Sequence, residues 1–338
     1  MQKFLLPKTE LNVSALCLGT AEIGVKNTDS EAKALLDLWL ELGGNFIDTA
    51  RIYSDWIPGE KGRSERILGD WLTSSRVRDR VILATKGGHP PLQDLAMGRC
   101  GRGDLKSDLE ASLRALRTDY VDLYWLHRDD PARSVEEIME TVHEFVVAGK
   151  VRYVGASNWT VDRIRAANRY AAKARLTPFC ATQQLWNLGS RWMRPHPDSW
   201  HLVMFDVAQE KLHMEEPLTA IPYNSQAGGF FSKILEGNDV VRAKAMESNF
   251  ATPQNLRLAE VVRAIATRRQ TSVAAIVLSY LFAFPFPVVP IIGCHRPDQL
   301  KEAVNSSVYT MLPDDFEQLR AVQGLGDPGE PDELASQR

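Results

Sequence analysis

Eight short apolar runs alternate with helical patterns along this chain, at intervals of roughly 30 residues, and no other sequence feature limits the fold as much. Because strands that alternate with helices form parallel βαβ units, the pattern predicts an α/β fold. Strands are expected at 15–18, 45–49, 81–85, 121–126, 152–155, 180–185, 218–223 and 288–292. Helices are expected at 30–42, 64–72, 105–116, 135–147, 162–174, 205–213, 256–268 and around 298–304.

A parallel sheet of this kind either stays open or closes into a barrel. An open dinucleotide-binding sheet carries a GxGxxG turn after its first strand and an acidic residue about 20 residues later. The chain has no such turn, since Gly98, Gly101 and Gly103 have a different spacing. Eight strands therefore predict a (β/α)8 TIM barrel. We expect a single domain over residues 1–338, with long loops at its C-terminal face, including 194–198 and 224–253.

The composition excludes several other classes of protein. With 44% hydrophobic and 25% charged residues, the chain is neither disordered nor fibrous. A net charge of −3 offers no basic surface to a nucleic acid. The four cysteines are widely spaced and form no CxxC pair. We therefore expect no metal site and no disulfide framework, and a reducing, cytoplasmic location.

One uncharged segment, at 272–292, has the length of a membrane span. Pro285, Pro287 and Pro290 interrupt it, so it cannot form one continuous helix. We interpret it as a buried helix over roughly 273–284, followed by a Pro-rich turn and the last strand. The N-terminus lacks the apolar stretch of a signal peptide, because charge returns at Lys8. No membrane partner is expected.

Titratable residues stand at the ends of three of the expected strands. A barrel places its active site at the C-terminal ends of its strands, where Asp48, Lys86 and His127 stand, with Tyr53 in the loop after the second strand. Each has an ordinary explanation on its own, such as a turn-capping aspartate, a solvated lysine or a packed histidine. Together they favour a proton-transfer site.

Several longer motifs resemble the aldo-keto reductase family. They are the segment 45–50 (NFIDTA) followed by Tyr53, the segments 62–69, 109–130 and 155–158, and Gln183 with Trp186 and Asn187. The resemblance covers about residues 4–305 and leaves 306–338 as a C-terminal extension. It points to bacterial-type members that reduce sugars, inositols or aldehydes.

The resemblance implies a role for each residue of the tetrad Asp48, Tyr53, Lys86 and His127. Tyr53 would protonate the carbonyl oxygen of the substrate as hydride reaches the carbon. A free phenol has a pKa of about 10, and the Lys86 ammonium is expected to lower it. Asp48 would hold Lys86, and His127 would orient the carbonyl.

The resemblance also implies a nicotinamide cofactor, with NADP(H) preferred over NAD(H). Ser157, Asn158 and Gln183 would bind the carboxamide, and Tyr223 would stack on the ring. Arg296 suits a 2′-phosphate, because a guanidinium forms charge-assisted hydrogen bonds to phosphate. The other expected cofactor-binding residues are Gly19, Thr20, Asp48, Asn224, Ser225, Gln226, Gly228, Lys233, Gly293, His295, Gln299 and Glu302.

Two positions depart from the family pattern. Ala303 stands where many relatives carry Asn, which removes one expected adenine contact. Ser54 stands where Gly commonly follows the tyrosine. Neither residue belongs to the proposed chemistry.

The substrate pocket is less defined. Trp56, Trp125 and Trp159 are expected to line the mouth, together with Trp192, and aromatic walls suit sugars and aromatic aldehydes alike. Arg51 and Arg128 flank the tetrad and are candidates for binding an anionic substrate. The insertion at 192–216 is long enough to cover the pocket. A sugar-like or other small carbonyl compound, and hence carbohydrate metabolism, is the expected substrate class.

Three functional hypotheses remain open at this stage. The first is an NADP-dependent reductase of aldehydes or ketones that also works in reverse. The second is a non-catalytic, nucleotide-sensing subunit on the same barrel, and the third is an enzyme that uses Lys86 to form a Schiff base. Nicotinamide-type residues such as Ser157 and Asn158 argue against the third. The sequence does not decide between a monomer and a homo-oligomer.

Overall fold

The structure is a computed structural model, and it describes residues 1–195 and 202–326. Its main sheet has eight strands in the order β10-β3-β4-β5-β6-β7-β8-β9, and all neighbouring pairs are parallel. The strands are β3 (Cys17–Gly19), β4 (Phe46–Asp48), β5 (Ile82–Gly87), β6 (Val121–Leu126), β7 (Val151–Ser157), β8 (Phe179–Gln183), β9 (Thr219–Ala220) and β10 (Ile291–Ile292). Each of the eight expected strands is confirmed.

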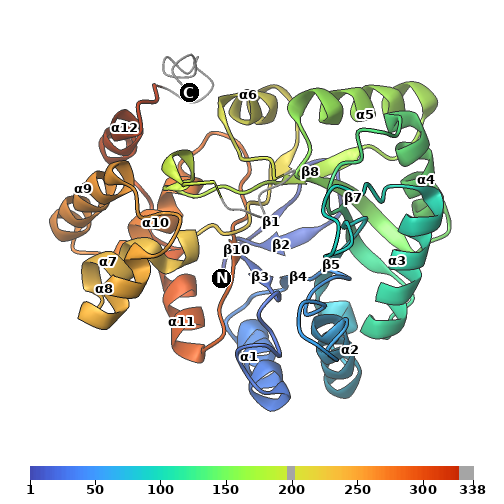
Figure 1. The fold of residues 1–338 in the computed structure, drawn as a ribbon, viewed down its shortest axis with the longest axis horizontal. Coiled ribbons are helices and arrows are strands. Elements are labelled where there is room, and N and C mark those ends of the chain that lie inside the picture. Colours follow the sequence, from blue (N-terminus) through green and yellow to red (C-terminus); the bar gives the residue numbers. More distant parts are fainter. Residues whose placement is uncertain (196–201, 327–338) are drawn as a thin grey trace.

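The first and last strands of the sheet meet, so the sheet closes into the predicted barrel. The Ala220 amide donates to the Pro287 carbonyl at 3.0 Å, and the Val289 amide donates to the Ala220 carbonyl at 2.9 Å. On the other side of β10, Ile291 pairs with Cys17 of β3. Figure 1 shows this sheet at the centre, with helices around its outside.

Helices separate successive strands and pack outside the barrel. Polar N-caps start many of them, and Thr28 and Glu31 form a capping box at the first. The helices are α1 (Asp29–Glu41), α2 (Arg63–Ser75), α3 (Arg102–Leu116), α4 (Val135–Val147), α5 (Val161–Ala174), α6 (Val207–Glu215), α7 (Phe230–Glu236), α8 (Asp239–Met246), α9 (Pro253–Arg269), α10 (Val273–Phe282), α11 (Pro297–Ser306) and α12 (Pro313–Val322), with short 3-10 turns at Arg78–Arg80, Ser190–Trp192 and Ala227–Gly229.

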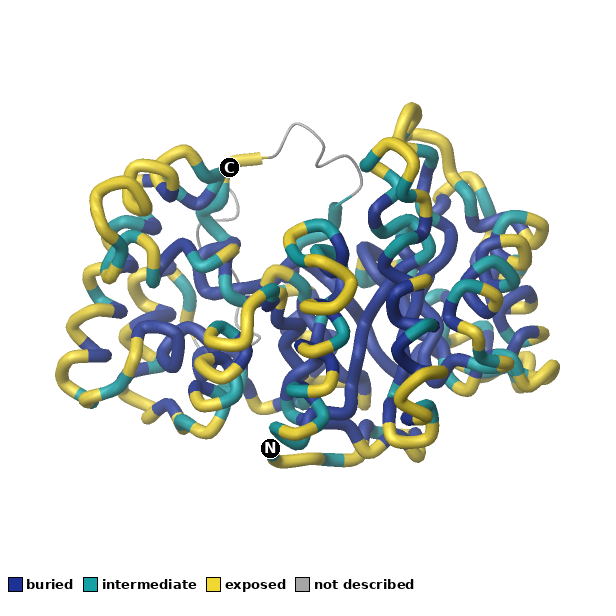
Figure 2. Tube along the Cα trace, turned by 90° about the horizontal axis from the view of Figure 1, so that it is seen from below, coloured by how far each residue is buried: buried dark blue, intermediate teal, exposed yellow. Residues whose placement is uncertain are grey.

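An N-terminal hairpin that the sequence did not predict fills one end of the barrel. It pairs β1 (Lys3–Leu5) with β2 (Asn12–Ser14) in antiparallel fashion. Leu6, Leu11 and Val13 are buried with the inward residues of the strands, such as Phe46 and Trp125. Figure 2 shows this buried interior running through the centre of the molecule. With this end filled, the opposite end is left for the loops that carry the polar strand-end residues.

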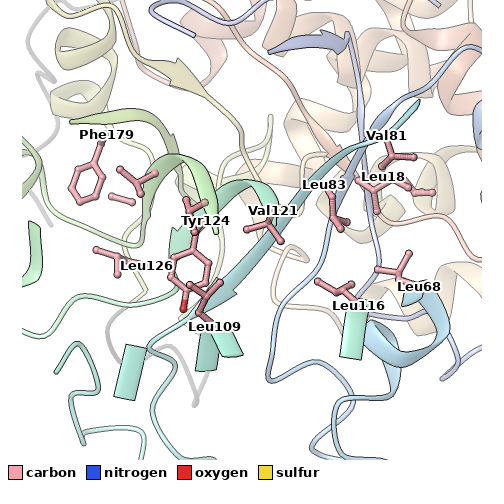
Figure 3. Packing of buried hydrophobic residues seen from close by; sticks show 14 of the residues in the cluster. Leu18, Leu68, Val81, Leu83, Leu109, Leu116, Val121, Tyr124, Leu126 and Phe179 are labelled. Atoms are coloured by element: carbon pink, nitrogen blue, oxygen red, sulfur yellow. The ribbon is translucent and has the colours of Figure 1, made fainter. Parts of the chain in front are cut away.

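A second apolar layer lies between the sheet and the surrounding helices. Outward residues of the strands, such as Tyr124 and Leu126 of β6, pack there against Leu109 of α3 (Figure 3). Residues 123 and 125 point inward while 124 and 126 point outward, as the two-residue period of a strand requires. The same period turns His127 toward the barrel axis, above Trp125.

Two regions differ from the sequence expectations, at 224–253 and after residue 305, whereas the helix and strand expected within 272–292 are confirmed. The segment 224–253, expected as a long loop, contains α7 and α8, and the region after residue 305 contains α12, which packs against α9. The uncharged segment at 272–292 forms α10 and then β10, and no helix in the described part of the chain is long and apolar enough to cross a membrane. The loop expected at 194–198 lies partly outside the described residues.

Candidate active site

The four tetrad residues meet at the C-terminal end of the barrel. Asp48 ends β4 and Lys86 lies in β5, and both are almost fully buried. The Lys86 ammonium donates to a carboxylate oxygen of Asp48, to the carbonyl of Thr49 at 2.8 Å and to the Tyr53 hydroxyl at 2.9 Å. Since Tyr53 accepts this bond, its own hydroxyl hydrogen is left to donate elsewhere.

His127 stands beside the tyrosine. Its ring centroid lies 6.1 Å from that of Tyr53, with the two planes 80° apart. The ring centroid of His89 lies 4.7 Å from that of His127, with the two planes 67° apart. His127 Nδ1 is buried and has no hydrogen-bond partner among the described residues. Sequence analysis missed His89, although its place three residues after Lys86 puts it in a loop at the same end of the barrel.

Burial dominates the acid–base properties of these groups. It raises the pKa of Tyr53 above its ordinary value, and Lys86 opposes that rise. Lys86 lowers the pKa of Tyr53, as expected, but the loss of solvation outweighs one ammonium, so Tyr53 is not more acidic than a free phenol. Burial also lowers the pKa of His127 well below its ordinary value, with smaller effects from His89 and Arg128. The site thus holds a protonated phenol and a neutral imidazole at pH 7.

Lys86 keeps its positive charge in this setting. Burial alone would lower the pKa of Lys86, but Asp48 and Tyr53 more than offset that effect and raise it. Burial raises the pKa of Asp48, and Lys86 opposes the rise. The other oxygen of Asp48 accepts a hydrogen bond from Gln183 Nε2 at 3.1 Å. A connected chain therefore runs from Gln183 through Asp48 and Lys86 to Tyr53.

The residues expected at the nicotinamide lie next to this chain. Ser157 Oγ donates to the Gln183 carbonyl at 2.8 Å, and Asn158 Nδ2 donates to Ser157 Oγ at 2.9 Å. The Tyr223 hydroxyl donates to Asn158 Oδ1 at 2.9 Å. Asn158 adopts φ 58°, a left-handed conformation that asparagine tolerates better than most residues. The structure thus brings all four expected residues to one side of the tetrad.

A turn rich in left-handed backbone follows Tyr223. Asn224, Ala227, Gly228 and Gly229 all have positive φ, and a Cβ added at Gly228 would meet no atom within 4 Å. Such a turn presents backbone N–H groups to an anion. Lys233 Nζ donates to the Gly228 carbonyl at 2.7 Å. Gln226 stands at the start of the same turn, and its side chain makes no capping hydrogen bond there.

Positive charge gathers near this turn. Burial lowers the pKa of Lys233, and Lys26 and Lys244 lower it further. Lys26 also contributes, after burial, to the lowered pKa of His295. Lys26 therefore lies within electrostatic range of both Lys233 and His295. Lys26, which was not expected from the sequence, stands in the loop after β3 and pairs with Glu22 at 2.7 Å.

The residues expected at the adenosine end surround the start of α11. Gln299 Oε1 accepts from the backbone N–H groups of His295 and Arg296 at 3.1 and 3.2 Å. The exposed Arg296 side chain pairs with Asp298 at 2.9 Å. Gly293 and Glu302 are exposed on the same side. A phosphate bound here would compete with Asp298 for Arg296.

Three of the expected cofactor residues have structural contacts of their own. A Cβ at Gly19 would lie 2.7 Å from a methyl carbon of Ile291, so glycine allows β3 and β10 to approach. The Thr20 hydroxyl donates to the Asp48 carbonyl at 3.0 Å, and the Ser225 hydroxyl donates to the Ile291 carbonyl at 2.6 Å. These residues help to build the rim of the barrel.

Of the four tryptophans expected at the mouth, Trp56 is exposed beside Tyr53, Trp192 lies half-buried in the Ser190–Trp192 turn, and the other two are fully buried. The Trp56 side chain is 46% exposed and lies 6.3 Å from the Tyr53 ring. Trp125 is fully buried because its strand position turns it into the barrel below His127. Trp159 is fully buried because it packs outside the sheet against Phe179, at 5.3 Å. The predicted contacts of Trp125 and Trp159 with substrate are therefore wrong.

The two arginines beside the tetrad differ in their partners. Arg51 pairs with Asp55 at 3.5 Å and lines a pocket of 510 Å³ between the loops after β4 and β5. His89 also lines this pocket, whereas Tyr53 and His127 do not. Arg128 directly follows His127, and its Nη1 donates to the His127 carbonyl at 2.9 Å. The part of the 192–216 insertion after the undescribed residues reaches the site, since the Val203 amide donates to Asn158 Oδ1 at 3.3 Å.

The barrel and its rim define a (β/α)8 oxidoreductase with a lysine-supported tyrosine at the C-terminal ends of the strands. The chain belongs to the aldo/keto reductase family, because residues 15–323 match the sequence model of that family. It is therefore an aldo-keto reductase family oxidoreductase, and the family typically uses NAD(P)H.

Individual relatives agree with this assignment. A norsolorinic acid reductase of Emericella nidulans is 33% identical over 321 residues, covering 90% of this chain and 76% of that protein. An aryl-alcohol dehydrogenase of Pestalotiopsis microspora is 29% identical over 332 residues, covering 94% of this chain and 80% of that protein. A thermostable aldo-keto reductase solved with the inhibitor epalrestat has the same fold, with a TM-score of 0.70 at 23% identity over 95% of this chain and 100% of that one.

Proposed function

We propose that this protein is an NADP(H)-dependent reductase that converts an aromatic aldehyde or ketone reversibly to its alcohol. The observation that carries the proposal is the hydrogen bond of 2.9 Å from the Lys86 ammonium to the Tyr53 hydroxyl. It leaves the phenol hydrogen directed to another acceptor, and the neutral His127 ring lies beside it. A carbonyl oxygen held between the two receives a proton from Tyr53 and a hydrogen bond from His127.

The electrostatic contribution of the site follows from its burial. Negative charge develops on the substrate oxygen during reduction, and donors fixed in advance stabilise it strongly where water is excluded. Lys86 stabilises the phenolate that Tyr53 becomes after it gives up its proton. Asp48 keeps Lys86 charged and oriented by accepting its hydrogen bond. General acid catalysis of this kind typically contributes 10²–10⁴-fold to a rate.

The residues around the tetrad suit a nicotinamide cofactor, which when bound supplies the hydride. Ser157, Asn158 and Gln183 offer donors and acceptors for a carboxamide, once the bonds that they make to one another are exchanged. The left-handed turn at Gly228 and Gly229 can approach a pyrophosphate closely. Arg296 would favour NADP(H), since its guanidinium suits a phosphate.

An aromatic substrate replaces the sugar-like one expected from the sequence. That expectation rested on a mouth rich in tryptophan, and Trp125 and Trp159 are both buried elsewhere. Trp56 supplies one exposed ring beside Tyr53, which suits edge or face contact with an aromatic group. The name of the aryl-alcohol dehydrogenase relative also supports this class, and neither curated relative reported above is named for a sugar.

The geometry weighs against a Schiff-base reaction at Lys86. A nucleophilic amine needs a free lone pair, but Lys86 is fully buried and donates three hydrogen bonds. Asp48 and Tyr53 raise the pKa of Lys86 despite its burial, so it stays protonated. A nucleotide-sensing subunit would keep the same residues, so the carbonyl screen described below is needed to distinguish it from a reductase.

The proposal is tested by a carbonyl screen with NADPH and NADH, followed through the absorbance of the reduced nicotinamide. We expect benzaldehyde and its derivatives to be reduced with a higher kcat/KM than aldose sugars, and NADPH to be preferred. Tight cofactor binding without turnover of any carbonyl would favour the nucleotide-sensing alternative. A preference for aldoses would overturn the aromatic substrate.

A further inference from the structure

Arg128 stands out because its side chain is half-buried at the mouth, and no carboxylate of the described residues pairs with it. Arg163 pairs with Asp129 and Arg320 pairs with Glu210, each within 3.0 Å. For Arg128, no ion pair exists within the described residues, and its Nη1 donates a hydrogen bond to the carbonyl of the preceding residue at 2.9 Å. A guanidinium carries five N–H donors, so most of its bonding capacity is left for another group.

Arg128 shares a hydrogen-bond acceptor with the expected nicotinamide residues and lies within electrostatic range of Tyr53 and Tyr223. The His127 carbonyl that accepts its hydrogen bond also accepts one from Asn158 Nδ2 at 3.3 Å. Asn158 Oδ1 in turn accepts from the Tyr223 hydroxyl. The guanidinium therefore lies over the end of β6 next to the expected nicotinamide residues, at the mouth that Tyr53 and His127 face.

The charge of Arg128 affects the pKa values of several groups at the mouth. Burial lowers the pKa of Arg128, while Tyr223 and Tyr53 oppose the effect. The same charge helps, after burial, to lower the pKa of His127 and of His89. A desolvated cation without a counter-ion is unfavourable, and its planar fork matches two oxygens of an anion. The mouth is thus built to receive negative charge beside the reacting carbonyl.

We propose that Arg128 binds an anionic oxygen of the substrate, and that the preferred substrate is an aromatic aldehyde or ketone with an acidic group on the same ring. This inference rests on the function proposed above and specifies its substrate class. A carboxylate would accept two parallel hydrogen bonds from the guanidinium, whereas an ionised phenol would accept fewer. The anionic oxygen is the shared feature, and the substrates below separate the two sources.

The test measures kcat/KM for matched pairs of substrates with NADPH. The three carboxybenzaldehydes are compared with their methyl esters, and the three hydroxybenzaldehydes with their methoxy analogues. We expect the wild type to prefer one acid isomer over its neutral partner by at least about tenfold, as one charge-assisted contact provides. In Arg128→Gln this ratio falls by about tenfold or more, and in Arg128→Lys, which keeps a point charge without the fork, it falls less.

A control separates this contact from the overall charge of the protein. Arg102 is exposed on α3 and pairs with Glu144. Arg102→Gln removes the same charge as Arg128→Gln and should leave the acid-to-ester ratio unchanged. If Arg128→Gln leaves the ratio unchanged as well, or if it weakens NADPH binding as much as it weakens turnover of the acid, the proposal is wrong.

A second test measures binding of a probe that does not react, so it does not depend on turnover. It uses the wild type and Arg128→Lys, and so it does not depend on the folding of Arg128→Gln. Binding to the NADPH complex is followed by the quenching of tryptophan fluorescence. Benzoate should bind with higher affinity than benzamide, both in the wild type and in Arg128→Lys. Equal affinities for benzoate and benzamide would overturn the proposal. A wild type that reduces neither benzaldehyde nor its acids, yet binds benzoate through Arg128, would overturn the proposed reaction and leave the anion site standing.

Discussion

In the proposed reaction, the hydroxyl of Tyr53 donates the proton to the substrate. Tyr53→Phe removes that hydroxyl and leaves the ring packed between His127 and Trp56. We expect the single-turnover rate of aldehyde reduction to fall by about 10²–10⁴-fold, because general acid catalysis contributes that much. The affinity for NADPH, measured separately by fluorescence, should change little. More than a tenth of the wild-type rate in the variant would move the proton donor to another group, with His127 as the first to examine.

Lys86→Met provides the companion measurement. It removes the ammonium that stabilises the phenolate, so the rate should fall by a similar factor although Tyr53 is still present. Residues that act as a unit give non-additive effects, and the double variant should be little slower than either single variant. Multiplied effects in the double variant would show that the two residues act independently.

Ser54, next to the catalytic tyrosine, carries strain. It is fully buried with φ 74°, and its hydroxyl has no partner among the described residues. A left-handed backbone costs a residue other than glycine about 1 kcal/mol, and an unpaired buried hydroxyl costs about as much or more. We expect Ser54→Gly to raise the free energy of unfolding by about 1–2 kcal/mol in urea titrations. Ser54→Ala, which keeps the Cβ, should gain less, and a larger gain for alanine would show that the backbone is unstrained.

At the scale of elements, His213 ties α6 to β8. Its Nδ1 contacts the Gln209 carbonyl at 2.7 Å and its Nε2 contacts the Thr182 hydroxyl at 2.8 Å, an arrangement that fits a neutral ring. Burial lowers the pKa of His213 to about 4. The unfolded chain, with an ordinary histidine pKa near 6.5, therefore binds more protons between these two values. Stability from this residue is full above pH 6.5 and is lost as the pH falls toward 4.

The size of that loss can be measured. Between pH 7 and pH 4.5, the free energy of unfolding of the wild type should fall by about 2–3 kcal/mol more than that of His213→Gln. The difference arises because the glutamine side chain does not titrate in this range. Buried groups elsewhere, such as His89 with its pKa lowered to about 4, contribute equally to both proteins. Parallel curves for the two proteins would show that His213 is protonated without penalty in the folded state.

The strands could be predicted from the sequence because the apolar runs that form them, and the helical patterns between them, are local properties. The sequence also placed Asp48, Lys86 and His127 correctly at one end, since residues at the ends of parallel strands share a rim. It misplaced Trp125 because one position along β6 decides between the mouth and the interior beneath it. The direction of Trp159 depends on its packing against Phe179, which no local pattern encodes.

Other parts of the structure depend on contacts between distant residues. Helix α12 was not expected, and its attachment combines apolar packing of Leu319 and Phe316 with ion pairs. Arg320 forms a buried pair with Glu210 of α6, and Asp315 pairs with Arg269 of α9. His89 and Lys26 were missed because they stand in loops, whose paths are set by tertiary packing. The raised pKa of Tyr53 likewise follows from burial, which becomes known only when the barrel is assembled.

For the whole molecule, cofactor binding should appear as added stability. NADPH at 100 times its Kd adds about 2.7 kcal/mol to the unfolding free energy, which for a chain of this length corresponds to about 4 °C in Tm. Arg296→Ala should reduce the shift produced by NADPH and leave that produced by NADH unchanged, when both are measured by calorimetry at fixed ligand concentration. Equal reductions for both cofactors would show that Arg296 does not contact the 2′-phosphate.

The pairing of β3 with β10 also affects how the chain emerges from a ribosome. Cys17 appears early, yet its partner Ile291 is made tens of seconds later at ordinary rates of translation. During that interval β3 presents an unpaired edge, which invites pairing with other chains. The barrel of this protein therefore cannot close until residue 291 is available, and a chaperone that shields the β3 edge would act before that point.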